Sequence, residues 1–573
     1  MRKLILTLSG ALFLWINAFA QNLVITGKVI SEKNTPLEGV SVVSSDGKNA
    51  TQTDKEGNYT ITVAETTKTL LFSFVNYQEV RKVVKGNVIN ITMSLADTKL
   101  EEVVVVGYGT QQKKAFTGSA SKIDVKQFST LLTPSIDKQL AGRAPGVQVT
   151  TSGGLANTPA VIRIRGIQSI TGNNGPLIVV DGTPIITGNL AFATNSNALG
   201  DINPADIETI DVLKDGSATA IYGSRAAAGV IIITTKKGTK GKSRVTYDGI
   251  AGYSSPLKKF DVLNASEFVT IVNEKLTNAG LTARAGVNTT AQSYNTDWQD
   301  LVMNKNAGNQ SHTISLQAGS DKTTFYFSAN YNDQKGIVIS NYNKSYRVRM
   351  NVDHELNKFI KFGNNLSVSR QQDGDQNNGA NSLGGAIASS LRLLPNVSPF
   401  SATGWEGYNI TYSPIGTSTN SMAIGPNTQS VDDNFFNVLY TMKKNKLYSD
   451  KYRFINNAYM EIAPLKGLKF RSQVGVDMFN DYSYTGQNVF HGDGFLTGTS
   501  SNSDFNILRL VWSNVLNYSK SYRNHSAYFT LGHEAQTETA KSLSANGGSL
   551  TDPFFIAENY ITNSGTNNTI AGT

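Results

Sequence analysis

The sequence predicts a mainly β, exported protein with an N-terminal β-sandwich, a mixed α/β block and an incomplete antiparallel transmembrane β-barrel. Three observations predict this fold class. The chain begins with an apolar segment of the secretory type, short alternating runs follow it, and the second half carries long segments of alternating apolar and polar residues. At 573 residues, the chain is also too long for a single hydrophobic core.

Residues 1–20 have the pattern of a cleaved secretory signal. A basic start at Arg2 is followed by an apolar run that ends at Trp15 and by a small-x-small cleavage site at residues 18–20. The alternative is a buried N-terminal helix, but no capping residue begins such a helix and the cleavage pattern ends it. We therefore expect the mature chain to begin at Gln21.

The composition excludes several classes of protein. The chain has no cysteine, so disulfides cannot stabilise it after export. It has 23 Tyr, 25 Phe and 51 Gly but only 14 Pro, which suits long paired strands with aromatic girdles. The net charge of +9 comes from scattered residues, which favours a solvated surface over a nucleic-acid-binding patch.

Residues 21–96 alternate like a small β-sandwich, with short runs separated by Gly, Asn and Asp. Gly57 is expected to supply a positive φ in a tight turn at residues 54–59. The region resembles the carboxypeptidase-regulatory-like domain, a non-catalytic accessory fold. The five histidines show no His-x-x-x-His spacing, so we expect neither a metal site nor hydrolytic activity here. The alternating runs are residues 25–30, 40–43, 58–63, 70–74 and 88–93.

Residues 97–112 form a linker that contains four consecutive valines, which favour an extended backbone. One interpretation is a further buried strand of the sandwich. The other is an accessible strand to which a partner protein adds its own strand, and the residues alone leave both open. The segment consists of Glu102, Val103, Val104, Val105, Val106, Gly107 and Tyr108.

Residues 113–239 are expected to form the mixed α/β block. Residues 135–140 predict a short helix. Asn203 followed by Pro204 predicts another helix start, because Asn caps a helix and Pro suits its first position. Motif residues are spread through the block: Arg163, Arg165, Gly166, Asp181, Gly182, Asp215, Tyr222, Gly223, Arg225 and Gly229.

Five motifs in order give the block a specific resemblance. Ile-Arg-Ile-Arg-Gly at 162–166, Val-Val-Asp-Gly at 179–182 and the runs at 206–215, 220–229 and 230–238 closely resemble the plug of TonB-dependent outer-membrane receptors. The preceding β-domain and the Glu-Val-Val-Val-Val-Gly-Tyr-Gly segment narrow the resemblance to the SusC/RagA-type transporters. The resemblance implies a plug inside a 22-stranded barrel. It also implies that residues 102–108 are a TonB box, to which the periplasmic protein TonB adds a strand.

Residues 240–573 alternate as a lipid-facing barrel with a wet interior requires. A soluble sandwich has the same period, but the plug-like block and the pattern of short and long connections favour the barrel. A helix is expected within residues 264–280, inside one long connection. We count about nine strands, fewer than a 22-stranded barrel needs. Residues 567–573 read as a polar loop without a terminal aromatic strand, so the chain is expected to be a fragment or a truncated product.

The resemblance implies TonB-dependent import of an oligosaccharide or peptide across the cell outer membrane, with a SusD-like surface lipoprotein and outer-membrane lipid as further partners. Alternatives are a surface signalling receptor, whose usual N-terminal extension is not visible, a secreted binding module and a non-transporting truncated product. No cofactor is implied. The sequence shows no nucleophile elbow or catalytic histidine arrangement, so an enzyme is not expected, and it names no substrate residue.

Overall fold

The computed structural model forms two compact units, residues 1–103 with 112–114, and residues 104–111 with 115–573. It describes residues 22–94, 103–106, 109–112, 119–123, 125, 135–374, 385–410, 437–548 and 569–572. Within these ranges it leaves out residues 33, 46, 48, 65, 66, 76, 85, 152, 153, 171, 173, 189, 192, 195, 283–292, 493–496, 523 and 524. The expected signal at residues 1–20 lies outside the described residues.

The first unit is the expected β-sandwich, made of a mixed three-stranded sheet and an antiparallel four-stranded sheet around one apolar core. Its alternation is plain in β4, where Tyr59, Ile61 and Val63 are buried and their neighbours are exposed. The tight turn before β4 is present, because Gly57 has φ +81° and the Asp54 carboxylate accepts the Asn58 amide at 2.7 Å. The first sheet has the strand order β4 (Asn58–Ala64), β1 (Asn22–Ser31), β7 (Ile91–Met93). The second has the order β3 (Ala50–Gln52), β2 (Ser41–Ser44), β5 (Thr69–Ser73), β6 (Val80–Val83).

The valine segment forms a strand of its own. β8 (Val103–Val106) pairs with β9 (Gly109–Gln112) in a two-stranded sheet that is separate from the other sheets of the described residues. Glu102, Gly107 and Tyr108 lie outside the described residues. The backbone is therefore extended where the four valines predict it, and it belongs to neither sheet of the sandwich.

The α/β block contains a five-stranded mixed sheet, a separate two-stranded sheet of β11 and β12, and short helices. The strand order is β10-β15-β16-β13-β14, and β13 and β16 run parallel to each other. Asn203 caps the Ala205 amide at 3.2 Å as expected, but the segment after it is a single 3-10 turn. The strands are β10 (Ala120–Ile123), β11 (Val147–Thr151), β12 (Ala160–Ile164), β13 (Leu177–Val180), β14 (Thr183–Pro184), β15 (Ile207–Leu213) and β16 (Val230–Thr235). The helical segments are α2 (Ile136–Gln139), α3 (Gly216–Thr219), η3 (Ala198–Asp201), η4 (Pro204–Asp206) and η5 (Ala220–Ala226).

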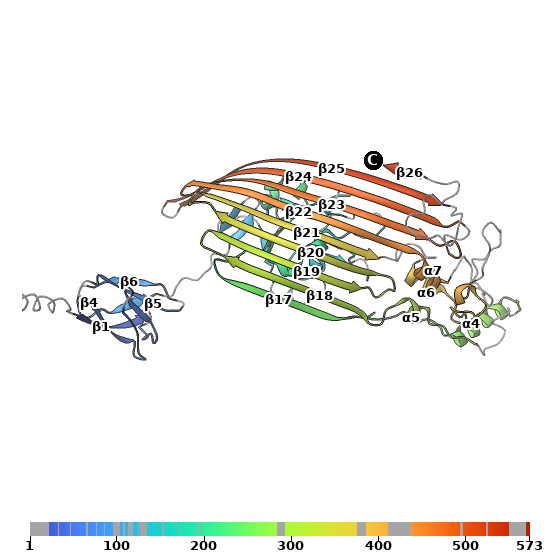
Figure 1. Ribbon diagram of the computed structural model, residues 1–573. Helices are drawn as coiled ribbons and strands as arrows, with labels where there is room; N and C mark the ends of the chain where they lie inside the picture. The colour runs from blue at the N-terminus through green and yellow to red at the C-terminus, as the bar shows by residue number, and fades with distance from the viewer. Residues whose placement is uncertain are drawn as a thin grey trace, which may run out of the picture. The chain divides into compact units, whose positions relative to one another are not determined.

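A ten-stranded antiparallel sheet follows in simple chain order, and Figure 1 shows its long strands curving over the α/β block. The sheet has ten described strands against the expected count of about nine, because part of residues 567–573, expected to be a loop, is a strand. Thr569–Gly572 form β26, which pairs with the end of β25. The strands are β17 (Gly241–Ser254), β18 (Ala307–Gly319), β19 (Thr323–Lys335), β20 (Tyr342–Glu355), β21 (Ile360–Gly374), β22 (Lys446–Leu465), β23 (Leu468–Gln487), β24 (Thr499–Tyr522), β25 (His525–Gly548) and β26.

The two faces of this sheet reverse the usual distribution of polarity. On β20, Tyr346 and Val348 are 46% and 44% exposed, whereas Arg347 and Arg349 are buried. Val368 of β21, directly opposite Val348, is 43% exposed, and large exposed apolar side chains recur on β22 to β25. An apolar outer face over a polar inner face is the arrangement of a lipid-facing barrel wall, and the sheet is unclosed.

Short helices lie in the connections at one end of the strands (Figure 1). The helix expected within residues 264–280 is present and begins with a capping box between Asn264 and Glu267. No helix in the described part of the chain is long and apolar enough to cross a membrane. The helices are α4 (Ala265–Asn278), α5 (Trp298–Val302), α6 (Ala386–Arg392), η6 (Trp405–Gly407) and α7 (Val438–Lys444).

Candidate functional site: the plug and sheet interface

The plug, residues 119–239 of the described chain, meets the polar face of the sheet in a buried network of charged groups. The cations come from alternate positions of two strands, Arg347 and Arg349 on β20 and Lys451 and Arg453 on β22. All four are at most 5% exposed. Burying a charge is costly unless it is paired and hydrogen-bonded, so the partners of these cations define the site.

Arg453 is the centre of the network. Its Nε donates to Asp477 Oδ1 at 3.0 Å, and its Nη1 donates to Asp201 Oδ2 of the plug at 3.1 Å. Nη2 donates to the Ile186 carbonyl at 2.7 Å, while the Ile186 amide donates to Asp477 at 2.7 Å. Burial raises the pKa of Asp201, and the neighbouring Arg453 opposes that rise. Sheet and plug therefore share one set of charges.

Asp181 and Gly182, two of the predicted motif residues, form a second contact with the sheet. Asp181 has φ +49°, and its carboxylate accepts the Thr235 amide at 2.9 Å and Arg349 Nη1 at 3.3 Å. Gly182 has φ +88°, and a Cβ there would lie 3.1 Å from the Gln473 side-chain nitrogen. The Asp-Gly pair thus turns the backbone sharply beneath the sheet and delivers a carboxylate to Arg349.

Lys451 forms the third contact. Its Nζ donates to Thr194 Oγ1 of the plug and to Asp373 Oδ2, both at 2.8 Å. Asp373 also accepts Asn343 Nδ2 at 2.6 Å and Asn157 Nδ2 of the plug at 3.2 Å. Amide and ammonium donors surround this carboxylate, so Asp373 serves the plug and sheet interface.

The other predicted motif residues lie in separate parts of the plug and make separate contacts. Arg225 donates to Glu534 and Gln536 of β25. Arg165 pairs with Asp215 within the plug. Tyr222 is buried in an apolar cluster of the plug. Gly166, Gly223 and Gly229 have φ of +96°, +68° and +92°. The structure therefore does not bring the motif residues together into one site.

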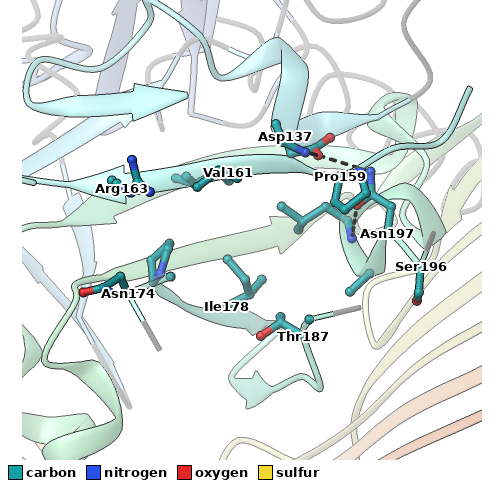
Figure 2. Close-up of a pocket in the computed structure, with 16 residues that line it drawn as sticks. Asp137, Pro159, Val161, Arg163, Asn174, Ile178, Thr187, Ser196 and Asn197 are labelled. Atoms are coloured by element: carbon teal, nitrogen blue, oxygen red, sulfur yellow. Dashed lines mark hydrogen bonds between the residues drawn. The ribbon is translucent and has the colours of Figure 1, made fainter. Parts of the chain in front are cut away.

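Arg163 lines a cavity of about 340 Å³ inside the plug, shown in Figure 2. The wall is largely apolar, with Val161 and Ile178 among its residues. Its polar residues Asp137 and Asn197 bind each other at 3.1 Å, and Asp137 also accepts the Ala160 amide. These two groups hold the plug loops together, whereas Arg163 Nε, in the same wall, is buried and has no hydrogen-bond partner among the described residues.

Neither the sheet cations nor Asp201 are predicted as site residues from the sequence. A usable signal was present, because Arg347 and Arg349, and likewise Lys451 and Arg453, are spaced by two on strands with apolar neighbours. Charged residues at that spacing lie on one face of a strand. No local sequence pattern identifies the plug residues that pair with these cations.

Two family models match the chain. The TonB-dependent Receptor Plug Domain matches residues 112–230, and the CarboxypepD_reg-like domain matches residues 25–105. The first match covers most of the mixed five-stranded sheet and the second covers the sandwich.

Curated relatives are similar over most of the chain. TonB-dependent receptor SusC of Bacteroides thetaiotaomicron is 35% identical over 417 residues, which is 72% of this chain and 40% of the relative. TonB-dependent receptor P3 of Formosa agariphila is 31% identical over 528 residues, 90% of this chain and 48% of the relative. The chain spans less than half the length of these relatives.

A solved structure, the RagAB peptide importer in its "open-open" state, has the same fold. Its TM-score is 0.65 at 23% identity, and the match covers 82% of this chain and 53% of that one. The sandwich, the plug and the sheet with its apolar outer face agree with these similarities. The chain belongs to the SusC-like TonB-dependent receptors.

Proposed function

We propose that this protein imports a nutrient, an oligosaccharide or a peptide, across the outer membrane in a TonB-dependent reaction gated by the plug. The observation that carries the proposal is the plug held against the polar face of the sheet by Arg349, Lys451 and Arg453. Ion pairs and hydrogen bonds of this kind can be replaced by hydrogen bonds to water, because each charged group is hydrated once it is exposed. Relatives named TonB-dependent receptors and a structural neighbour named a peptide importer support the class of function.

We propose that TonB binds the valine strand by strand addition. β8 is extended and has only β9 beside it among the described strands. Main-chain hydrogen bonds supply the affinity in this mode of recognition, so the segment needs an available edge more than particular side chains. Residues 102–108 are the proposed TonB box, and TonB would use the second edge of β8 or replace β9.

The remaining partners are proposed from the family. A cleaved signal at residues 1–20 would deliver the protein to the outer membrane, where lipid would contact the apolar face that includes Val348. A SusD-like surface lipoprotein would cover the end of the strands that carries α4 to α7. These proposals rest on the resemblance and on the position of those helices.

Uptake by cells that produce the protein with Val104→Pro and Val105→Pro tests the energy coupling. Proline removes two backbone donors, so uptake should fall to the level of cells without TonB. The matched control is Val104→Thr with Val105→Thr, which keeps both donors and a β-branched side chain and should preserve uptake. Normal uptake by the proline variant, at equal amounts in the outer membrane, would refute the assignment.

A further inference from the structure

A separate set of polar contacts holds the start of the described plug to the end of β15, the strand beside β10 in the five-stranded sheet. The Ser119 amide donates to Asp215 Oδ2 at 2.6 Å, and its carbonyl accepts the Lys214 amide at 3.2 Å. Lys214 Nζ donates to Ser121 Oγ and to the Pro145 carbonyl. Lys214 and Asp215 directly follow β15 and thus fix the first residues of β10. We call Ser119, Ser121, Lys214, Asp215 and Arg165 the N-terminal clamp.

Within the clamp, Arg165 binds the carboxylate of Asp215. Its Nη1 donates to Asp215 Oδ1, and its own backbone has φ +58°, a conformation that residues other than glycine rarely adopt. The Ser119 amide and, after it, Arg165 lower the pKa of Asp215, so the carboxylate is charged at neutral pH. The side chains of Arg165 and Asp215 are 49% and 30% exposed. Water therefore reaches the pair, and the clamp can open without first exposing an apolar core.

The strand held by the clamp supports both apolar clusters of the plug. β10 is an edge strand that pairs only with β15 among the described strands. Ile123 is buried in the cluster that contains Val212, and Ala120 packs against the cluster that contains Leu213. Loss of β10 would expose β15 and open both clusters at once.

We propose that the N-terminal clamp is where tension on the valine strand β8 enters the plug, and that its rupture releases β10 as the first step of plug displacement. In chain order β8 and β9 precede this part of the plug, and Ser119 is where the described plug begins. A pull along a chain loads the nearest fixed contacts first. The inference rests on the proposed function because it takes tension to arrive through Val103–Val106.

Single-molecule pulling on the protein in a lipid bilayer tests the clamp. The chain has no cysteine, so Val104→Cys supplies one thiol for the handle and needs no TonB. Asp215→Ala should shorten the lifetime of the first rupture event at fixed force about tenfold, because it removes two charge-assisted hydrogen bonds. Lys214→Met should shorten it as well. Lys122→Gln is the matched control, since it removes a charge from β10 outside the clamp and should leave the lifetime unchanged.

Equal lifetimes for Asp215→Ala and the unsubstituted protein would overturn the clamp. Tryptophan fluorescence of each variant before pulling shows whether the plug and sheet unit is folded, because Trp298, Trp405 and Trp512 all belong to it. Titration with the periplasmic domain of TonB is a separate readout. If TonB binds but the rupture lifetimes of the variants are unchanged, the clamp alone is rejected. If the rupture lifetimes change but TonB does not bind, the proposed energy coupling is rejected.

Discussion

Arg453 and Asp477 lie on adjacent strands of the sheet and are joined by two parallel hydrogen bonds of 3.0 and 2.8 Å, with both side chains buried. The same guanidinium reaches Asp201 and the Ile186 carbonyl of the plug. One side chain therefore fixes the register of β22 against β23 and holds the plug at the same time.

Arg453→Met should destabilise the plug and sheet unit by about 3–5 kcal/mol, because it leaves Asp477 and Asp201 buried without their cation. Urea unfolding followed by tryptophan fluorescence measures the change. Arg370→Met is the control, since Arg370 pairs with Asp450 on the sheet with its side chain 43% exposed and should change the stability by less than about 1 kcal/mol. Equal losses in the two variants would contradict the central role of Arg453.

Gly229→Ala should destabilise the same unit by about 2 kcal/mol or more. The residue has φ +92°, and the added Cβ would lie 2.7 Å from Ile164 Cδ1 and 3.1 Å from the Leu213 carbonyl oxygen. Gly216→Ala provides the comparison, because a Cβ there meets nothing within 4 Å. The same unfolding measurement should place Gly216→Ala within about 1 kcal/mol of the parent protein.

Val348→Lys should lower the stability of the sheet in a lipid bilayer by about 2–4 kcal/mol, because a charge on the lipid face of a barrel strand is costly. Folding into vesicles of defined lipid, followed by urea titration, measures it. Val348→Leu should be nearly neutral. Ser320→Lys, in the exposed turn between β18 and β19, should also be tolerated. A neutral Val348→Lys would argue that this face does not meet lipid.

The connection around His491 should lose stability in mild acid. The buried imidazole accepts the Asn437 amide at Nε2 over 2.7 Å, and burial lowers its pKa to about 3. Because the unfolded pKa is near 6.5, the unfolded state binds the proton first, so stability falls as the pH drops from about 6.5 towards 3. The ring centroids of Trp405 and Phe490, the residue before His491, lie 4.8 Å apart, so Trp405 fluorescence reports the change. His491→Phe should remove the dependence; its persistence would point to another group.

Local patterns predicted much of this fold. The helix within residues 264–280, the tight turn at Gly57 and the alternation around Val348 each depend on residues within one element. β26 was missed because four residues with one large apolar side chain, Ile570, are too few to show an alternation, and their pairing with β25 forms the strand.

The site was less predictable for a physical reason. Arg453 and Asp201 are 252 positions apart, and a charge on a strand does not specify which distant carboxylate will neutralise it. Asp181 and Gly182 were identified only by family resemblance, and their positive φ values supply the reason for that motif.

The buried cations of β20 and β22 also restrict the order of assembly. Arg347, Arg349 and Arg453 each find at least one partner in the plug, at Gly200, Asp181 and Asp201. A sheet that curved shut around an empty interior would hold these guanidinium groups against water alone, and a plug arriving later would have to strip that water inside a confined space. Gathering of the strands around the plug while their charged faces are still hydrated would avoid that step.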